Sequence, residues 1–193
     1  DTDEGKKDLS DETTRYNENL KGINDAIESK QNQLKSINNS YYAEKATLDS
    51  TLNQKLKSVE TEKAERLSEL NKRTESIVNS LIEERDDALA QAKNQYDDDI
   101  AAAKKKGATT EQINDIKTAY SNKKKVIQDD YAKQMSIRKK QLEQEENDIN
   151  SLYNSKKQGI QEEYAKDLNT LDNKYDSQRL PIINDINNFV GAR

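Results

Sequence analysis

Cysteine, histidine and tryptophan are all absent from this chain, which has one proline and five glycines among its 193 residues. Without cysteine no disulfide can form, and the sequence gives no indication of the redox compartment. Without histidine and cysteine the chain lacks the commonest general base, the thiolate nucleophile and the soft metal ligands. We therefore expect a protein that is not an enzyme, with no catalytic residue, no cofactor site and no metal site.

Apolar residues are also scarce, because only 31% of the chain is hydrophobic and the mean hydropathy is -1.22. This composition is too polar for an ordinary globular core. It differs from that of a disordered chain, since 32 basic residues nearly balance 37 acidic ones and the apolar residues recur at regular intervals. No apolar run approaches the roughly 20 residues that a membrane span needs. Good helix formers with few glycines and one proline indicate long helices.

An eleven-residue repeat is the clearest pattern in the chain. It is carried by Tyr120, Tyr131, Tyr153, Tyr164 and Tyr175, with Leu142 in the one remaining position. Upstream, Tyr41 and Tyr96 begin blocks of the same length, and the fifth and eighth positions of the blocks are usually apolar. Eleven residues make almost three helical turns, so the repeat places an apolar stripe along a straight or gently right-handed helix.

The expected architecture is all-α: a long antiparallel helical hairpin, formed as a coiled coil with eleven-residue repeats, and a short C-terminal helix. We predict a flexible N-terminus at 1–9, a first helix over 10–106, a turn at 107–109, a second helix over 110–179 and a short apolar helix over 181–191. Ser10 is the expected N-cap of the first helix. Gly107 suits a helix C-terminus, and Thr109 with Gln112 forms a candidate capping box for the next helix. Pro181 ends the repeat and is placed to open the last helix.

The phase of the repeat changes near Gly107, and this change predicts that the chain folds back. Tyr96 and Tyr120 are 24 residues apart, two more than two blocks, so a continuous helix would rotate its apolar stripe by roughly 200°. Folding back instead pairs residues whose numbers add to 216, so that Tyr96 meets Tyr120 and Tyr41 meets Tyr175. The predicted seam consists of Tyr41, Leu48, Leu56, Leu67, Leu81, Leu89, Tyr96, Ile100, Ile116, Tyr120, Ile127, Tyr131, Met135, Ile149, Tyr153, Ile160, Tyr164, Leu168 and Tyr175.

Some layers of this seam are apolar on one side only, as where Leu70 lies opposite Glu146. Long charged side chains can direct their ends outward, so we expect such layers to weaken the hairpin without preventing it. In the same register, residues 10–36 extend beyond the second helix. They are expected to be free for a partner or for the C-terminal segment.

The C-terminal segment is the most apolar part of the chain and the best local candidate for an interaction site. Its candidate residues are Ile182, Ile183, Ile186, Phe189 and Val190. The segment either docks on a partner, another subunit or a membrane surface, or packs on the chain's own hairpin, and the sequence favours neither. We expect protein partners or self-association through helical faces and this segment, with a membrane as the less favoured alternative. Acidic residues surround each lysine-rich run, so no specific nucleic-acid binding is expected.

The block-wise helical pattern, and the segment AAAKKKGATTEQINDIKTAY at residues 101–120 in particular, resembles helical repeat segments of bacteriophage tail tape-measure and internal virion proteins. The resemblance implies a non-enzymatic structural or assembly rod or spacer that sets a length during virion assembly, and a location in the virion. The first residue is Asp and not Met, so we expect a fragment or a processed product.

A lipid-surface or protective helix is the alternative function. Exchangeable apolipoproteins, synucleins and desiccation-protective proteins are also built on eleven-residue repeats. The apolar stripe of this chain is narrow, and the opposite face carries mixed charge without a basic flank, which favours the structural role.

Overall fold

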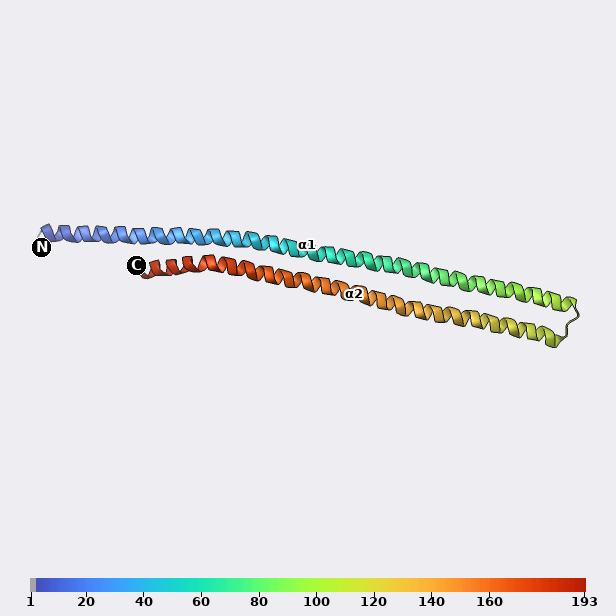
Figure 1. The fold of residues 1–193 in the computed structure, drawn as a ribbon. Coiled ribbons are helices and arrows are strands. Elements are labelled where there is room, and N and C mark those ends of the chain that lie inside the picture. The colour runs from blue at the N-terminus through green and yellow to red at the C-terminus, as the bar shows by residue number, and fades with distance from the viewer. Residues whose placement is uncertain (1–2) are drawn as a thin grey trace. The chain divides into compact units, whose positions relative to one another are not determined.

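The computed structural model describes residues 3–193, and this part of the chain contains two α-helices and no strand. Helix α1 spans Asp3–Lys105 and helix α2 spans Thr110–Gly191. They contribute to two compact units: the end unit, Asp1–Ser58 with Lys157–Arg193, and the turn unit, Val59–Lys156. Within each unit the two helices lie side by side in opposite directions (Figure 1). The expectation of an all-α hairpin is therefore confirmed.

The connection between the helices lies in the turn unit at residues 106–109. Gly107 has a positive φ of 74°, a left-handed conformation that glycine adopts without steric cost. The Gly107 N–H donates to the carbonyl of Lys104 at 3.1 Å, and the Ala108 N–H donates to the carbonyl of Ala103 at 3.0 Å. This pair of bonds is the Schellman motif, which satisfies carbonyls that the end of a helix leaves without partners.

The predicted capping box at the start of α2 is present. The Thr109 N–H donates to the side-chain oxygen of Gln112 at 2.9 Å, and the Gln112 N–H donates to the Thr109 hydroxyl at 3.2 Å. Two N–H groups at the helix start are satisfied reciprocally. The turn is thus stabilised by side-chain and backbone bonds on both sides of Gly107.

The predicted start of the first helix at Ser10 is wrong, because α1 already includes residues from Asp3 onward. Asp3 and Glu4 lie in its first turn, where the helix dipole favours negative charge, and no proline interrupts this stretch. Ser10 lies inside the helix, where its carbonyl accepts a bond from the Thr14 hydroxyl at 2.9 Å. Residues 1 and 2 of the expected flexible N-terminus lie outside the described part of the chain.

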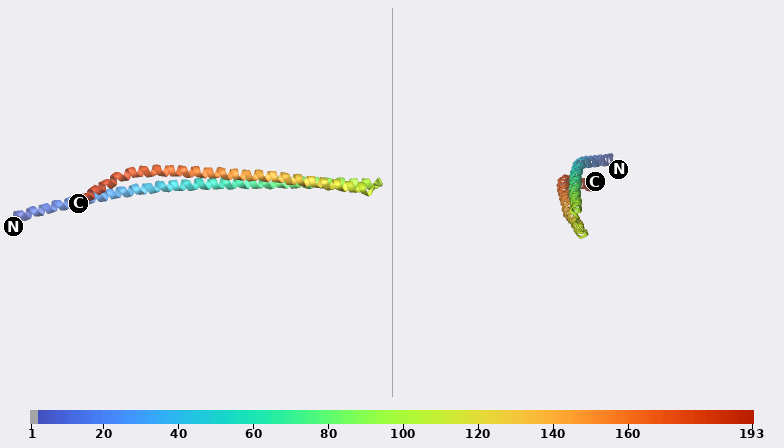
Figure 2. Two further views of the ribbon diagram at one scale, coloured as in Figure 1. Left: turned by 90° about the horizontal axis from the view of Figure 1, so that it is seen from below. Right: turned by 90° about the vertical axis from the view of Figure 1, so that its right-hand side faces the viewer.

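The expected separate helix over 181–191 is also wrong, because α2 continues through Pro181 to Gly191. The φ angle of proline is compatible with a helix, and its cost is one lost N–H bond and crowding against the preceding turn. The apolar residues that follow pack beside α1, and this burial offsets that cost. Figure 2 shows α2 bending toward α1 in its last part, as expected near a proline inside a helix.

The buried residues form a thin apolar line in each unit rather than an enclosed core. No described side chain is completely buried, and the least exposed residues are Ile27, Val59, Leu70, Leu81, Ala92, Tyr153, Leu171 and Tyr175. Two packed helices cannot surround a residue on every side, so each buried side chain keeps an edge in water. Stability therefore depends on many partly buried contacts along the seam.

Candidate interaction surface

The C-terminal part of α2 divides its apolar residues between two directions. Ile182, Ile186 and Phe189 are half-buried beside α1. Ile183 and Val190 instead remain exposed, by 39% and 50% of their surface. The five predicted interaction residues are therefore not one face: three belong to the hairpin and two are available to another molecule.

The exposed direction continues toward the middle of α2, where Leu180 is 60% exposed. Leu180, Ile183 and Val190 are three and seven residues apart, so they lie on one side of the helix. A monomeric protein carries many single exposed apolar residues, but three on one helical face form a stripe. We call Leu180, Ile183 and Val190 the outer stripe.

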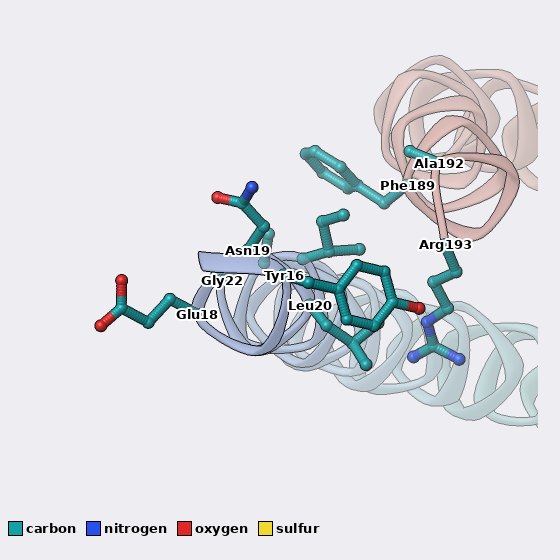
Figure 3. A pocket seen from close by; sticks show the side chains of 10 residues that line it. Tyr16, Glu18, Asn19, Leu20, Gly22, Phe189, Ala192 and Arg193 are labelled. Carbon is teal, nitrogen blue, oxygen red and sulfur yellow. The ribbon is translucent and has the colours of Figure 1, made fainter. Parts of the chain in front are cut away.

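A groove of about 540 Å³ opens in the end unit where α2 stops beside α1. Figure 3 shows Phe189 and Arg193 on the α2 side and Tyr16 with Leu20 on the α1 side. The groove exists because the apolar face of α1 continues past the last turn of α2. It is open to solvent and is not an enclosed cavity.

The first part of α1 has no helix beside it. Residues 3–19 are all exposed, including Leu9 at 67% and Tyr16 at 59% of their surface. Figure 1 shows this segment extending past the end of α2 within the end unit. Of the predicted overhang at 10–36, the C-terminal part of α2 covers the later residues, as one of the two expected alternatives has it, and leaves Ile27 only 5% exposed.

A polar cluster in the end unit, which we call the tyrosine clasp, joins α1 to α2 before Pro181. It consists of Tyr41, Glu44, Asp172, Tyr175 and Arg179. The Tyr41 hydroxyl donates to Asp172 at 2.7 Å, and the Tyr175 hydroxyl donates to Glu44 at 2.6 Å. The two rings meet edge to face with centroids 5.6 Å apart. The Arg179 guanidinium lies 4.5 Å from the centroid of the Tyr41 ring, a cation–π distance.

The clasp is held in place by bonds to its neighbours. Arg179 Nε donates to the Asn38 side chain at 2.8 Å, and Lys174 Nζ donates to Glu44 at 2.9 Å. The Lys174 bond, with that of Tyr175, lowers the pKa of Glu44. The Glu44 carboxylate in turn raises the pKa of Tyr175, because ionising the hydroxyl would lose the bond and place two negative charges together.

A third tyrosine–carboxylate pair lies outside the clasp in the end unit. The Tyr164 hydroxyl donates to Asp49, which also accepts a bond from Lys45 at 2.9 Å. These two donors lower the pKa of Asp49, and Asp49 raises the pKa of Tyr164. A tyrosine whose pKa is raised above 10 exchanges protons poorly at neutral pH, so these pairs suit packing and not acid–base chemistry.

Every predicted seam residue is half-buried or buried within its own unit. In the turn unit Tyr96 stacks on Tyr120, with centroids 4.5 Å apart, and the Arg85 guanidinium lies 4.6 Å from the centroid of the Tyr131 ring. The Tyr41–Tyr175 and Tyr96–Tyr120 contacts are the two tyrosine pairs that the antiparallel register predicts.

The predicted seam does not include several of the most buried residues. Val59, Leu70 and Ala92 are only 8%, 6% and 2% exposed, although each lies opposite a charged residue in the predicted register. Lys124, level with Ala92 in this register, is half-buried and places its Nζ 4.6 Å from the centroid of the Tyr120 ring on its own helix. Layers with one charged side therefore still bury their apolar side. All three residues occupy the eighth position of a block, and the apolar character of that position is the sequence signal that indicates their burial.

The polar members of the clasp were also missed, and single-chain periodicity carries no signal for them. Glu44, Asp172 and Arg179, and the neighbouring Asn38, lie beside the apolar stripe. Only the placement of the second helix shows which carboxylate each tyrosine reaches.

The described residues hold no group of three or more acidic side chains arranged for a metal ion. Across residues 3–193, neither helix has a stretch that is both long and apolar enough to cross a membrane. No protein-family model matches the chain, and no curated protein and no solved structure shows significant similarity to it.

Proposed function

We propose that this chain is a non-enzymatic structural element, a helical spacer that presents protein-binding surfaces in its end unit. The observation that carries the proposal is that helices of 103 and 82 residues pack along a thin seam, with no completely buried side chain in the described part. A chain of this composition provides helix length and surface, whereas a substrate site usually needs an enclosed apolar pocket.

The finer proposal is a coiled coil with eleven-residue repeats and a role in virion assembly, as in bacteriophage tape-measure or internal virion proteins. The coiled-coil part is supported by tyrosine contacts at positions that recur every eleven residues. The virion part is supported by the pattern of residues 101–120 alone.

The proposed partners are proteins, or a second copy of the chain, that bind the outer stripe or the uncovered first part of α1. An isolated helix of this length is marginal in water, so residues 3–19 gain stability from any helix that packs on Leu9 and Tyr16. Sedimentation equilibrium over a range of concentrations tests self-association. If Leu9→Ser with Tyr16→Ser leaves the association constant unchanged, this surface is not the self-association site.

Circular dichroism separates the structural role from a lipid-surface role. A structural hairpin is strongly helical in buffer and melts cooperatively without lipid. A helix that folds on lipid has a weak signal in buffer, which rises when vesicles with anionic headgroups are added. The second result would contradict the structural proposal.

Deleting matched blocks tests whether the repeats act as spacer units. Removing 74–84 from α1 together with 132–142 from α2 takes one block from each helix of the turn unit, in facing positions. We expect this variant to remain helical, and the maximum dimension in solution scattering to fall by about 16 Å, from 1.5 Å per residue. Removing 74–84 alone is the control, because it leaves a block of α2 without its counterpart and lowers the melting temperature. A matched deletion that unfolds the chain would show that the blocks are not interchangeable.

A further inference from the structure

Lys30–Asp185 joins α1 to α2 in the end unit. Four other ion pairs between the helices, two in each unit, share one register. They are Glu44–Lys174 and Lys55–Glu163 in the end unit, and Glu62–Lys156 and Arg73–Glu145 in the turn unit. The residue numbers of every pair add to 218, so all four belong to one antiparallel register. We call them the charge ladder.

The polarity of the charge ladder alternates within each unit. In the end unit α1 supplies first an acid, Glu44, and eleven residues later a base, Lys55, while α2 supplies the complementary Lys174 and Glu163. The turn unit repeats the arrangement, with Glu62 followed by Arg73 on α1 and their partners on α2. The spacing between pairs equals the length of one sequence block.

The apolar seam does not distinguish registers that differ by one block. Tyrosines recur every eleven residues on α2, so a shifted helix would place Tyr164 where Tyr175 now meets Tyr41. Likewise Leu56, now level with Ile160, would face Ile149 or Leu171. A shift of one block therefore keeps one of the two tyrosine contacts, Tyr41 with Tyr164 in one direction or Tyr96 with Tyr131 in the other, and several apolar layers.

The charge ladder is not restored by such a shift. Movement in one direction brings Glu44 to Glu163 and Glu62 to Glu145, so acids face acids. Movement in the other direction brings Lys55 to Lys174 and Arg73 to Lys156, so bases face bases. The first shift thus creates one like-charge pair in each unit. The second creates two in each unit, because it also brings Glu44 to Asp185 and Glu62 to Asp167.

We propose that the alternating charges of Glu44, Lys55, Glu62 and Arg73 against α2 select the register of the hairpin by making both one-block shifts electrostatically unfavourable. The Gly107 turn sets the register locally in the turn unit, whereas the ladder extends this selection into the end unit. Exposed ion pairs contribute little to folding stability, but register selection depends on the difference between attractive and repulsive pairs. Because the repeats permit registers shifted by one block, a feature that does not repeat from block to block is needed to select one register. The alternating charges are that feature.

The register can be measured as the distance between two spin labels by double electron–electron resonance. The chain has no cysteine of its own, so labels attach only at introduced cysteines. Spin labels at Ser80→Cys with Ser136→Cys report the turn unit, and labels at Thr47→Cys with Asn169→Cys report the end unit. All four positions are exposed, and the members of each pair are level in the 216 register. A shift of one block displaces one label along the axis by about 16 Å.

Reversing the ladder on α1 alone is the test. This reversed variant carries Glu44→Lys, Lys55→Glu, Glu62→Lys and Arg73→Glu, which leave the net charge unchanged. We expect the single distance of the parent to broaden or to gain a population displaced by about 16 Å, because four like-charge pairs now oppose the native register. In about 1 M salt, where the screening length is about 3 Å, the parent distance returns.

Two further variants decide the interpretation. The compensated variant adds Lys174→Glu, Glu163→Lys, Lys156→Glu and Glu145→Arg, and it should regain the parent distances even though Glu44→Lys removes the acceptor of the Tyr175 hydroxyl bond. The control variant makes the same kinds of exchange at four other exposed α1 positions, Glu65→Lys, Arg66→Glu, Glu69→Lys and Lys72→Glu, and should keep the parent distances. Parent distances in the reversed variant overturn the proposal, and so does a compensated variant that stays shifted or unfolded. An unfolded reversed variant with a folded compensated variant supports it.

Discussion

Tyr96 and Tyr120 stack across the two helices of the turn unit, with ring centroids 4.5 Å apart and an interplanar angle of 15°. Nearly parallel rings at this distance are a favourable aromatic arrangement, in which each ring covers one face of the other. The two tyrosines lie on either side of Gly107 in the sequence. Their stack shows that the turn places the apolar stripe of α2 against that of α1. The ring contact therefore depends on the left-handed conformation of Gly107.

Replacing Gly107 with alanine should weaken the hairpin at this point. A left-handed φ costs a residue with a Cβ atom about 1 kcal/mol relative to glycine, and no neighbouring atom would obstruct the added Cβ. We expect the free energy of unfolding in urea to fall by about that amount. Gly159→Ala is the matched control, because Gly159 is exposed inside α2 and alanine should stabilise the helix by roughly 0.5–1 kcal/mol. Equal effects at both positions would rule out conformational strain as the cause.

Replacing Tyr153 with alanine should destabilise the turn unit more than any change at an exposed tyrosine. The Tyr153 residue is only 3% exposed, and truncating a buried aromatic side chain costs about 3 kcal/mol through lost burial and the space left behind. Tyr16→Ala is the control, since Tyr16 is 59% exposed. Chemical denaturation followed by circular dichroism measures both. If the two losses match, the rings of the repeat do not pack as seam residues.

The hairpin was predictable from the sequence because its signals are local or strictly periodic. The Gly107 turn, the Thr109 capping box and the pairing of Tyr41 with Tyr175 each follow from residue spacing and helix geometry. The boundaries at Ser10 and Pro181 were wrong for a different reason. Both residue types favour helix ends. At Ser10 no competing turn ends the helix, and after Pro181 the burial of apolar residues beside α1 overrides the preference.

The candidate surface was only partly predictable. Composition identified the apolar residues from Ile182 to Val190, but their division between α1 and solvent depends on where the bend places the helix. The clasp depends on polar side chains such as Arg179 and Asn38, which meet only after the second helix is placed. Periodicity reports a buried face, whereas hydrogen-bond partners across a seam depend on register and side-chain length.

Acid should destabilise the end unit through Glu44 and Asp49. Folding lowers the pKa of Glu44, chiefly through Lys174, and that of Asp49, chiefly through the Tyr164 hydroxyl. A group with a lowered folded pKa binds fewer protons when folded, so its stabilisation is complete above its ordinary pKa and is lost as pH falls through the folded value. We expect the melting temperature to hold down to about pH 5 and to fall below about pH 4.5.

A variant with Tyr164→Phe and Tyr175→Phe tests this assignment. It removes the hydroxyl donors to Asp49 and Glu44 but keeps the rings that pack in the seam. The variant should melt at a lower temperature at neutral pH and lose less on acidification than the parent chain. An undiminished acid-induced loss would assign the pH dependence to other carboxylates.

Replacing Pro181 with alanine should stabilise the last turns of α2. Alanine restores an N–H that can donate to the carbonyl of Ser177, four residues earlier, and removes the contact of the proline ring with that turn. The cost of proline in a helix interior is about 3 kcal/mol, so amide exchange over 182–191 should slow by on the order of tenfold or more. Ser177→Ala is the control: it removes the hydroxyl bond to the carbonyl of Asn173 but leaves the backbone pattern intact, so exchange there should change little. Unchanged exchange in the alanine variant would mean that the contacts of Ile182, Ile186 and Phe189 with α1, and not the missing hydrogen bond, limit how often this segment opens.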